Sequence, residues 1–273
     1  MFSSATGTSR ADRLPGLHRG INRFVWDLRY APVHGLSNCA GSGGCTGKLR
    51  LPPPQAPWVR TGSKGYRHIV SWDLDLAHRG PLAVPGRDRV TLEIGTRHWS
   101  QMLQVKKDPD SSGNLADIRA QVAFSLQIRS EINASVHMID EIEWMRKTLS
   151  GIEARLVADG NHPVTLAQAR HLGQVLLGVE GRLFDVYLTG AREDAFRHPM
   201  EIYGRLCALL KDVEDSADYP PTDQDRAVFR ILRHDLQAVG IRFREVQQKE
   251  VAPFNRRLEG RGLAGVVPAG RAR

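Results

Sequence analysis

Hydrophobic positions between residues 114 and 159 recur in steps of three and four, the spacing that places side chains on one face of an α-helix. These positions are Ile132, Val136, Ile139, Ile142, Met145, Leu149, Ile152 and Leu156. The stretch contains no proline and a single glycine, so nothing in it forces a break. It predicts a helix over about 114–158, roughly 65 Å long, which must lie against partner helices because one compact core cannot bury it.

Three more stretches after the long one have helical patterns. They predict helices at about 165–189, 199–215 and 222–251, and Thr165 is expected to cap the first of these. Three glycines weaken that helix by up to about 1 kcal/mol each relative to alanine, and close approach of a neighbouring element is one reason for having them. They are Gly173, Gly178 and Gly181.

Two further signals concern the ends of the last helix. Thr222-Asp-Gln-Asp225 resembles a capping box in which aspartate replaces the usual glutamate. Pro253 is expected to kink or end the helix, because proline removes a backbone hydrogen bond.

Before the long helix the pattern changes to alternation, which is typical of strands. Residues 20–30 alternate, and Trp26 is interpreted as a core anchor of a β-sandwich. A second strand is predicted at 66–76. Beyond a turn at 80–86, Val90, Leu92 and Ile94 are expected to point inward, and a short connection leads to a return strand. The strand runs from Trp99 to Val105, so this region predicts a β-hairpin.

Changes in composition divide the chain into regions. Residues 1–19 are polar and are expected to be a disordered leader or the torn edge of a larger protein. Residues 20–109 predict a small β-sandwich-like domain with an irregular or disordered insertion at about 33–65, where glycine and proline crowd together. Residues 110–259 predict a helical domain, and 260–273 a frayed tail. The predicted fold class is therefore α+β, a small sandwich followed by a long-helix antiparallel bundle.

Composition and charge narrow the classes of function. The 273 residues are 41% hydrophobic and 25% charged, as is ordinary for a globular protein. No run of 18 apolar residues occurs, so no membrane span is predicted, and the first twenty residues lack the apolar core of a secretory signal. The net charge of +8 is dispersed, because arginine alternates with acidic residues along the helices. A solvated basic surface is therefore favoured over nucleic-acid binding.

The cysteines and the glycine-rich loop offer little chemistry. Cys39 and Cys45 could pair in an oxidising compartment, and a zinc site would need more ligands than nearby His34 supplies. Lys48 follows a glycine, but Leu49 stands where a phosphate-binding loop requires serine or threonine, so such a loop is excluded. The third cysteine, Cys207, is expected to be a small core residue.

Two groups of acidic and histidine side chains are candidates for catalysis or metal binding. On the predicted strand at 66–76, a metal or acid pair is less favoured than a polar face in water; the residues concerned are His68, Asp73, Asp75 and His78. On the long helix, Asp140, Glu141 and Glu143 lie close to Arg146 and Lys147, so ion pairs on a solvated face are favoured over a hydrolase pair.

Other candidates also favour structural roles. His137 fits the polar edge of the long helix, and His98 and Trp99 on the hairpin fit packing better than ligand contact. We therefore predict no catalytic, cofactor-binding or metal-binding residue, and no cofactor.

Several stretches resemble the C-terminal region of bacterial sortilin-like proteins, the BNR/Asp-box β-propeller proteins often labelled glycosyl hydrolases. The first is Arg23-Phe-Val-Trp-Asp-Leu-Arg-Tyr30, and the second is Gly80-Pro-Leu-Ala-Val-Pro-Gly86 leading to Asp108-Pro109. Gln127-Ile-Arg129 and the ending at 254–268 are also similar, so the resemblance covers about residues 20–30 and 80–268. It implies an immunoglobulin-like sandwich and a helical segment that follow a propeller, in a family that is typically exported.

This chain departs from the family pattern at three points. It lacks the propeller with its Asp-box repeats, Asp88 stands where the family tends to have an aromatic residue, and residues 33–79 replace a short connection. A truncated product is therefore expected. Its expected function is that of a non-catalytic scaffold or protein-interaction module that docks a propeller or another protein partner. The alternative is an accessory fragment of a glycoside hydrolase-like enzyme, and nucleic-acid binding is the weakest hypothesis.

Overall fold

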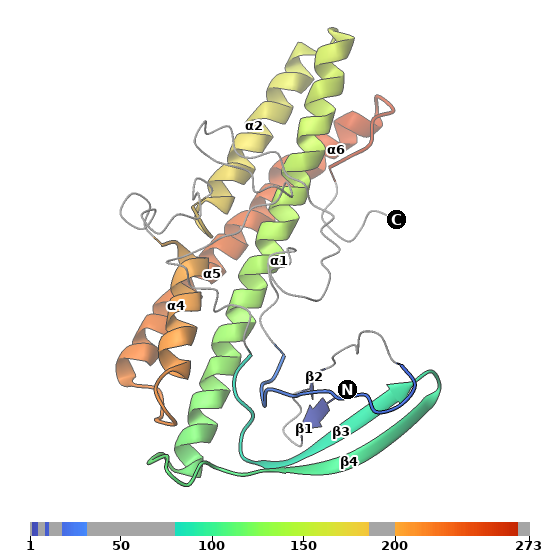
Figure 1. Ribbon diagram of the computed structural model, residues 1–273. Coiled ribbons are helices and arrows are strands. Elements are labelled where there is room, and N and C mark those ends of the chain that lie inside the picture. Colours follow the sequence, from blue (N-terminus) through green and yellow to red (C-terminus); the bar gives the residue numbers. More distant parts are fainter. Residues whose placement is uncertain (1, 5–8, 11–17, 32–79, 186–199, 267–273) are drawn as a thin grey trace.

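The computed structural model describes residues 2–4, 9–10, 18–31, 80–185 and 200–266. Long helices form a bundle, and an antiparallel sheet lies beside one end of it (Figure 1). The mixed class of helix and sheet is thus confirmed. Within these ranges the strands belong to a single sheet, so the second layer of a sandwich is not shown.

The sheet has the strand order β2-β1-β3-β4, with antiparallel pairing throughout. The two short strands are β1 (Phe2–Ser4) and β2 (Ser9–Arg10). The long ones, β3 (Gly86–Ile94) and β4 (Arg97–Val105), form the predicted hairpin. Gly95 has a φ of 60° in the two-residue turn between them, a value that glycine adopts without strain.

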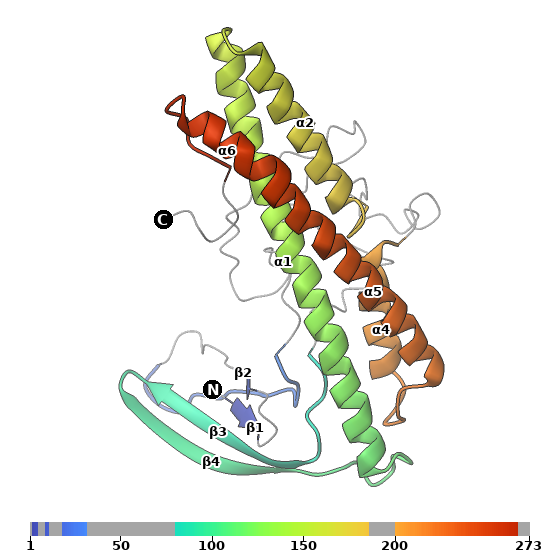
Figure 2. The same cartoon turned by 180° about the vertical axis from the view of Figure 1, so that it is seen from behind.

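The bundle is an up-down-up arrangement in which several helices share one core. Helix α1 (Leu115–Asp159) runs its full length. Helices α2 (Pro163–Glu180) and α4 (Ile202–Glu214) return along it one after the other. Helix α5 (Asp223–Val246) then runs parallel to α1 and leads into a π-helical turn, η2 (Gln247–Val251), and α6 (Ala252–Glu259) (Figures 1 and 2). The long helix therefore does lie against partner helices, as its length required.

Both ends of α1 have local signals. The side chain of Asn114 accepts hydrogen bonds from the amides of Ala116 and Asp117, and Asp117 completes a capping box. Gly160 ends the helix with a φ of 68°, in the left-handed region. Between these caps the predicted stripe is buried, and Ile132, Ile139 and Ile142 are fully inaccessible to solvent.

The beginning of α2 differs from the prediction. His162 is its N-cap, Pro163 is its first residue, and no side chain caps it. Thr165 lies inside the helix, is buried, and accepts a hydrogen bond from Arg261, so the prediction that it caps the helix is wrong. Proline at the first position removes one of the amides that a cap would otherwise satisfy.

Gly173 and Gly178 of α2 do not serve the close approach of a neighbour that the sequence suggested. A Cβ atom placed on Gly178 would meet nothing within 4 Å, and one on Gly173 would meet only the end of a flexible side chain at 3.9 Å. They do not admit a close neighbour. At the later helix, by contrast, the capping box of Thr222 and Asp225 is confirmed.

Pro253 does not end the last helix. The chain passes from α5 through the π-helical turn into α6, and the amide of Ala252 donates to the carbonyl of Gln247, five residues earlier. Proline cannot donate to the carbonyl four residues before it, and its ring crowds that carbonyl. The wider turn immediately before Pro253 gives the carbonyl space and keeps the helix continuous.

The predicted strand at 20–30 does not form. Leu28 has a φ of 57°, which interrupts an extended chain, and the amide of Arg29 donates to the Asp27 carboxylate across the resulting turn. Only an isolated bridge joins Arg29 to Leu82. Trp26 is half-buried and packs on a small cluster beside α1 rather than in a sandwich core.

Several predictions concern residues outside the described ranges. They are the strand at 66–76, the insertion at 33–65, the ends of the chain, the part of the second helix after 185, and the residues His34, Cys39, Cys45, Lys48, His68, Asp73, Asp75 and His78.

Candidate interaction surface

The base of the hairpin is fixed to the N-terminal part of α1 by a second, smaller core. The amide of Tyr30 donates to the Pro81 carbonyl at 2.8 Å, which joins the two segments on either side of residues 32–79. Tyr30 is 5% exposed and packs with Ile118 and Val122 of α1. The segments that lead to and from β3 are thus held against the bundle by apolar packing.

Two arginines reinforce this attachment. Arg29 donates to the Gly80 carbonyl at 2.8 Å and forms an ion pair with Glu214 of α4 at 3.3 Å. Arg129 of α1 donates to the Ala31 carbonyl at 2.6 Å, and burial lowers the pKa of its guanidinium. Each arginine donates to a backbone carbonyl of a segment next to the hairpin, and each connects that segment to another element. Together they fix the path of the chain at the base of the hairpin.

The linker between β4 and α1 docks on the loop between α4 and α5. Gly113 lies so close to Asp218 that an added Cβ would stand 2.2 Å from its carbonyl oxygen. Ser111 donates to the Asp218 carboxylate, and the hydroxyls of Ser112 and Tyr219 are 2.8 Å apart. The segment that leads into β3 and the linker that follows β4 are therefore each attached to the bundle.

The two faces of the hairpin have opposite character. Cross-strand pairs place Leu92 opposite Trp99 and Val90 opposite Gln101, so these side chains share a face with Ile94 and Leu103. The other face carries Arg89, Thr91, Glu93, Ser100 and Met102. The alternation predicted from the sequence is thus present, and it produces one apolar face.

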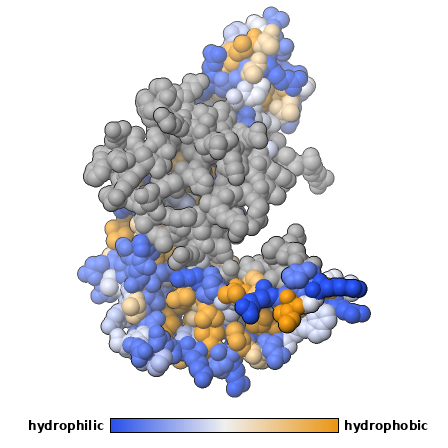
Figure 3. Space-filling view, viewed as in Figure 1, coloured by the Kyte–Doolittle hydropathy of each residue, from blue (hydrophilic) through white to orange (hydrophobic). Residues whose placement is uncertain are grey.

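This apolar face is open to solvent, contrary to the inward direction that the sequence suggested. Leu92 is 42% exposed, Ile94 46% and Trp99 51%. In Figure 3, hydrophobic residues gather in the lower part of the view, where the hairpin runs. We call this surface the hairpin face; its residues are Val90, Leu92, Ile94, Trp99 and Leu103. Trp99, which the sequence favoured as a packing residue, contributes to an exposed apolar surface instead.

Asp88 lies on the same side of the sheet, at the base of the hairpin. It is 7% exposed, its Oδ2 atom has no hydrogen-bond partner among the described residues, and burial raises the pKa of its carboxyl. Burying a carboxylate oxygen that has no hydrogen-bond partner costs free energy. The charged form of Asp88 is therefore disfavoured at this position.

The arginine beside the acidic residues of α1 has a partner on another helix. Arg146 forms an ion pair with Glu180 of α2, and Glu180 is fully buried. Asp140, Glu141 and Glu143 are half-buried on α1, and His137 and His98 are exposed.

The Arg146–Glu180 pair was missed by sequence analysis, although a signal was present. Glu180 follows Leu172 and Leu176 in steps of four, so it lies on the buried face of α2. A charged residue at such a position requires a buried partner of opposite charge. The pair joins the C-terminal part of α2 to the middle of α1.

Cys207 is a free cysteine in the core, as expected. It is buried on α4, and burial raises the pKa of its thiol to about 12, although a hydrogen bond with Tyr203 opposes the shift. A thiol with so high a pKa is a poor nucleophile near neutral pH.

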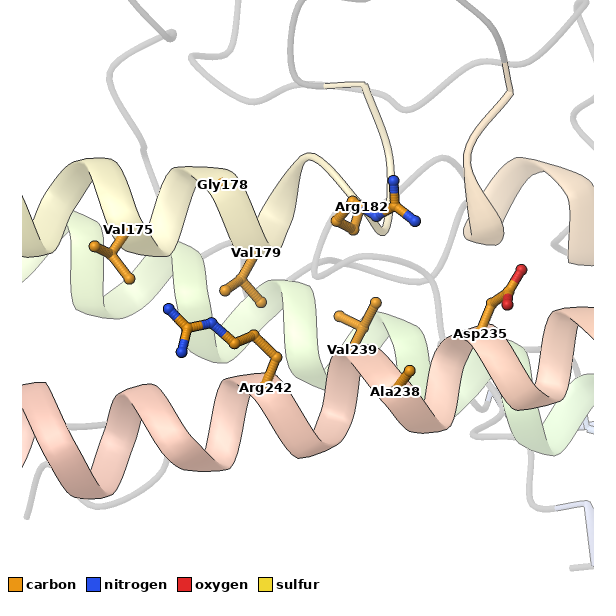
Figure 4. A pocket seen from close by; sticks show the side chains of 8 residues that line it. All are labelled: Val175, Gly178, Val179, Arg182, Asp235, Ala238, Val239 and Arg242. Atoms are coloured by element: carbon orange, nitrogen blue, oxygen red, sulfur yellow. The ribbon is translucent and has the colours of Figure 1, made fainter.

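A shallow groove of about 430 Å³ runs between α2 and α5 (Figure 4). Its floor is apolar and its rim is charged; the lining residues are Val175, Gly178, Val179, Arg182, Asp235, Ala238, Val239 and Arg242. Arg242 extends from α5 toward α2, with Glu245 and Glu250 at 3.5 and 3.8 Å. Its cationic charge is thus largely neutralised, and the groove has no buried polar group to orient a ligand.

The described ranges show neither a metal cluster nor a membrane-spanning helix. Those ranges contain no cluster of three or more histidine, cysteine or acidic residues that could hold a metal, and none of their helices is long and apolar enough to cross a membrane. Comparison with protein-family models, curated proteins and solved structures finds no match to this chain. The resemblance to sortilin-like proteins therefore stays a prediction.

Proposed function

We propose that this protein is a non-catalytic scaffold that presents the hairpin face to a protein partner. The observation that carries the proposal is an exposed apolar surface on a hairpin whose base is attached to the bundle before β3 and after β4. Exposed apolar surface of this kind marks sites of protein interaction. A rigid support reduces the entropy that binding must overcome.

The helical bundle suits a supporting role. Its single core runs along α1 and includes residues of every other helix, so its apolar positions are occupied by packing. Close-packed cores have low compressibility, so helices that share one core move little relative to one another. The hairpin is thereby held at a fixed place relative to the far end of the bundle.

The resemblance suggests which partner to test first. In the sortilin-like family the hairpin belongs to an immunoglobulin-like sandwich beside a propeller, and we propose that a partner completes the second layer here. Two layers of a sandwich pack through apolar inner faces about 10 Å apart. The hairpin face supplies one such face, with Trp99 at its centre.

The test is a calorimetric titration of this protein with the propeller domain of a bacterial sortilin-like protein. We expect binding that Trp99→Ser weakens about tenfold or more, because truncating a central aromatic residue typically removes 2 kcal/mol or more. Met102→Ser is the matched control, since Met102 lies on the same strand, is 56% exposed and faces the opposite side. Equal effects of the two substitutions would contradict a role for the hairpin face.

A further inference from the structure

The outer edge of β4 carries backbone groups without partners in the described part of the chain. A two-residue turn makes Ile94 and Arg97 a hydrogen-bonded pair, and such pairs then alternate along the hairpin. Residues 99, 101 and 103 therefore bond to β3. The amides and carbonyls of the residues between them point away from the sheet; these residues are His98, Ser100, Met102 and Gln104.

This edge lacks the features that usually protect an edge strand. Proteins block such edges with proline, lysine, bulges or very short strands. Strand β4 is nine residues long, pairs with β3 without a bulge, and contains neither proline nor lysine. Its only permanently charged residue, Arg97, is at its first position. The edge can therefore accept another strand.

We propose that β4 pairs antiparallel with β4 of a second copy, across a two-fold axis at Gln101. In this register the outward residue Ser100 meets the second copy's Met102, and His98 meets its Gln104. The outward amides and carbonyls of both strands then pair along the whole of β4. The result is one continuous eight-stranded sheet made of two four-stranded sheets.

In this register the side chains of β4 match those of β4 in the second copy. Trp99 lies opposite the second copy's Leu103, on the hairpin face, and aromatic–aliphatic pairs of this kind stabilise sheets. Arg97 lies opposite the second copy's Val105, so no like charges face one another. The neutral Gln101 faces itself at the axis. Other registers pair fewer residues of the strand.

This inference goes beyond the proposed function, because it adds a second copy as a partner of the same hairpin through a different surface. It uses the edge of β4, whereas the proposed propeller contact uses the hairpin face. A single strand pair buries less area than a standard interface of roughly 1,200–2,000 Å². We therefore expect a weak and reversible dimer, in which two hairpin faces lie side by side.

The test uses charge at the axis and sedimentation velocity of the full chain over a range of concentrations. Gln101 is exposed and faces its own counterpart in the dimer. Gln101→Lys and Gln101→Glu should each weaken self-association about fivefold, because like charges are placed opposite one another. An equal mixture of the two variants should restore association. Restoration supports both the two-fold axis and the register, and failure of the mixture to exceed either variant overturns them.

A proline substitution tests the backbone contact independently. The Ser100 amide points outward, so Ser100→Pro leaves the bonds to β3 intact and should weaken the dimer about tenfold or more. Unchanged circular dichroism verifies that the variant is folded, and Ser100→Ala is the control. A wild-type chain that is monomeric at every concentration, or whose Ser100 and Met102 amides resist exchange as a monomer, overturns the inference. Persistent propeller binding by such a monomer would leave the proposed function standing.

Discussion

At the scale of single residues, Asp88 has its carboxyl on the same face of the hairpin as the apolar residues Val90 and Leu103. Its pKa is raised above the ordinary 3.8 by burial, so the folded state holds the proton more tightly than the unfolded state. The stability that this supplies is complete below about pH 3.8 and is lost as the pH rises through the folded pKa. Near neutral pH the group is a net burden on the fold.

We therefore predict that Asp88→Asn stabilises the protein near neutral pH by about 1 kcal/mol, since the amide has a similar shape and carries no charge. The gain should shrink toward zero as the pH falls below the carboxyl's ordinary range. Urea denaturation at about pH 7 and about pH 3.5 measures both values. A variant that is less stable than wild type at both would mean that the carboxylate has a stabilising partner.

A second residue-scale prediction concerns Arg146 and Glu180. Removing the arginine leaves a fully buried carboxylate without its cation, so Arg146→Met should cost about 3 kcal/mol of unfolding free energy. Glu180→Gln should cost less, because the Arg146 side chain is 19% exposed and can reach water. The double variant should be more stable than the sum of the two losses predicts. Strict additivity in chemical denaturation would show that the pair is not coupled.

At the scale of elements, the hydrophobic pattern predicted an element correctly where caps or turns in the sequence supported the same element. The stripe of α1 is regular over eight positions and has a cap at each end, so periodicity located the helix. The hairpin was predictable because alternation and its turn coincide. Residues 20–30 also alternate, but a turn at Leu28 and packing on α1 replace the strand. Alternation cannot reveal that a segment lacks a neighbouring strand.

The candidate surface was only partly predictable for the same reason. The sequence identified which hairpin residues share a face, because that follows from the period of a strand. It did not identify the face as exposed, since this depends on elements distant along the chain. Likewise Pro253 indicated a disturbance of the last helix, but the sequence did not indicate the π-helical turn that accommodates the proline.

Two glycine substitutions test the docking of the β4–α1 linker. Gly113→Ala should cost about 2 kcal/mol, because the new methyl group would overlap the backbone of Asp218, which cannot move freely. Gly151→Ala within α1 should instead stabilise by about 0.5–1 kcal/mol, since its methyl group meets nothing within 4 Å. Thermal or urea unfolding measures both. Two substitutions with the same sign would contradict the close contact at Gly113.

At the scale of the whole molecule, the bundle has one half that contains α2 and another that contains α4. Helices α1 and α5 contact both halves and join them. Contacts of α1 with α4 include the bond from Gln121 to the Val213 carbonyl at 2.7 Å, and its contacts with α2 include Arg146. These two points on α1 are about 37 Å apart along the helix. Helix α5 also contacts both halves. The ring of Phe229 packs edge-to-face on Phe124, with the ring centroids 5.2 Å apart, and the continuation of α5 places Glu250 3.8 Å from His171.

This continuity predicts that the bundle unfolds as one cooperative unit. Leu176 of α2 and Leu206 of α4 lie in different halves, and both are inaccessible to solvent. Each alanine substitution should cost about 2–5 kcal/mol and should shift a single transition in circular dichroism and calorimetry. The two losses should add within about 0.5 kcal/mol, because the sites are distant. A second transition, moved by only one substitution, would mean that α1 does not couple the halves and that the hairpin is supported by its own half alone.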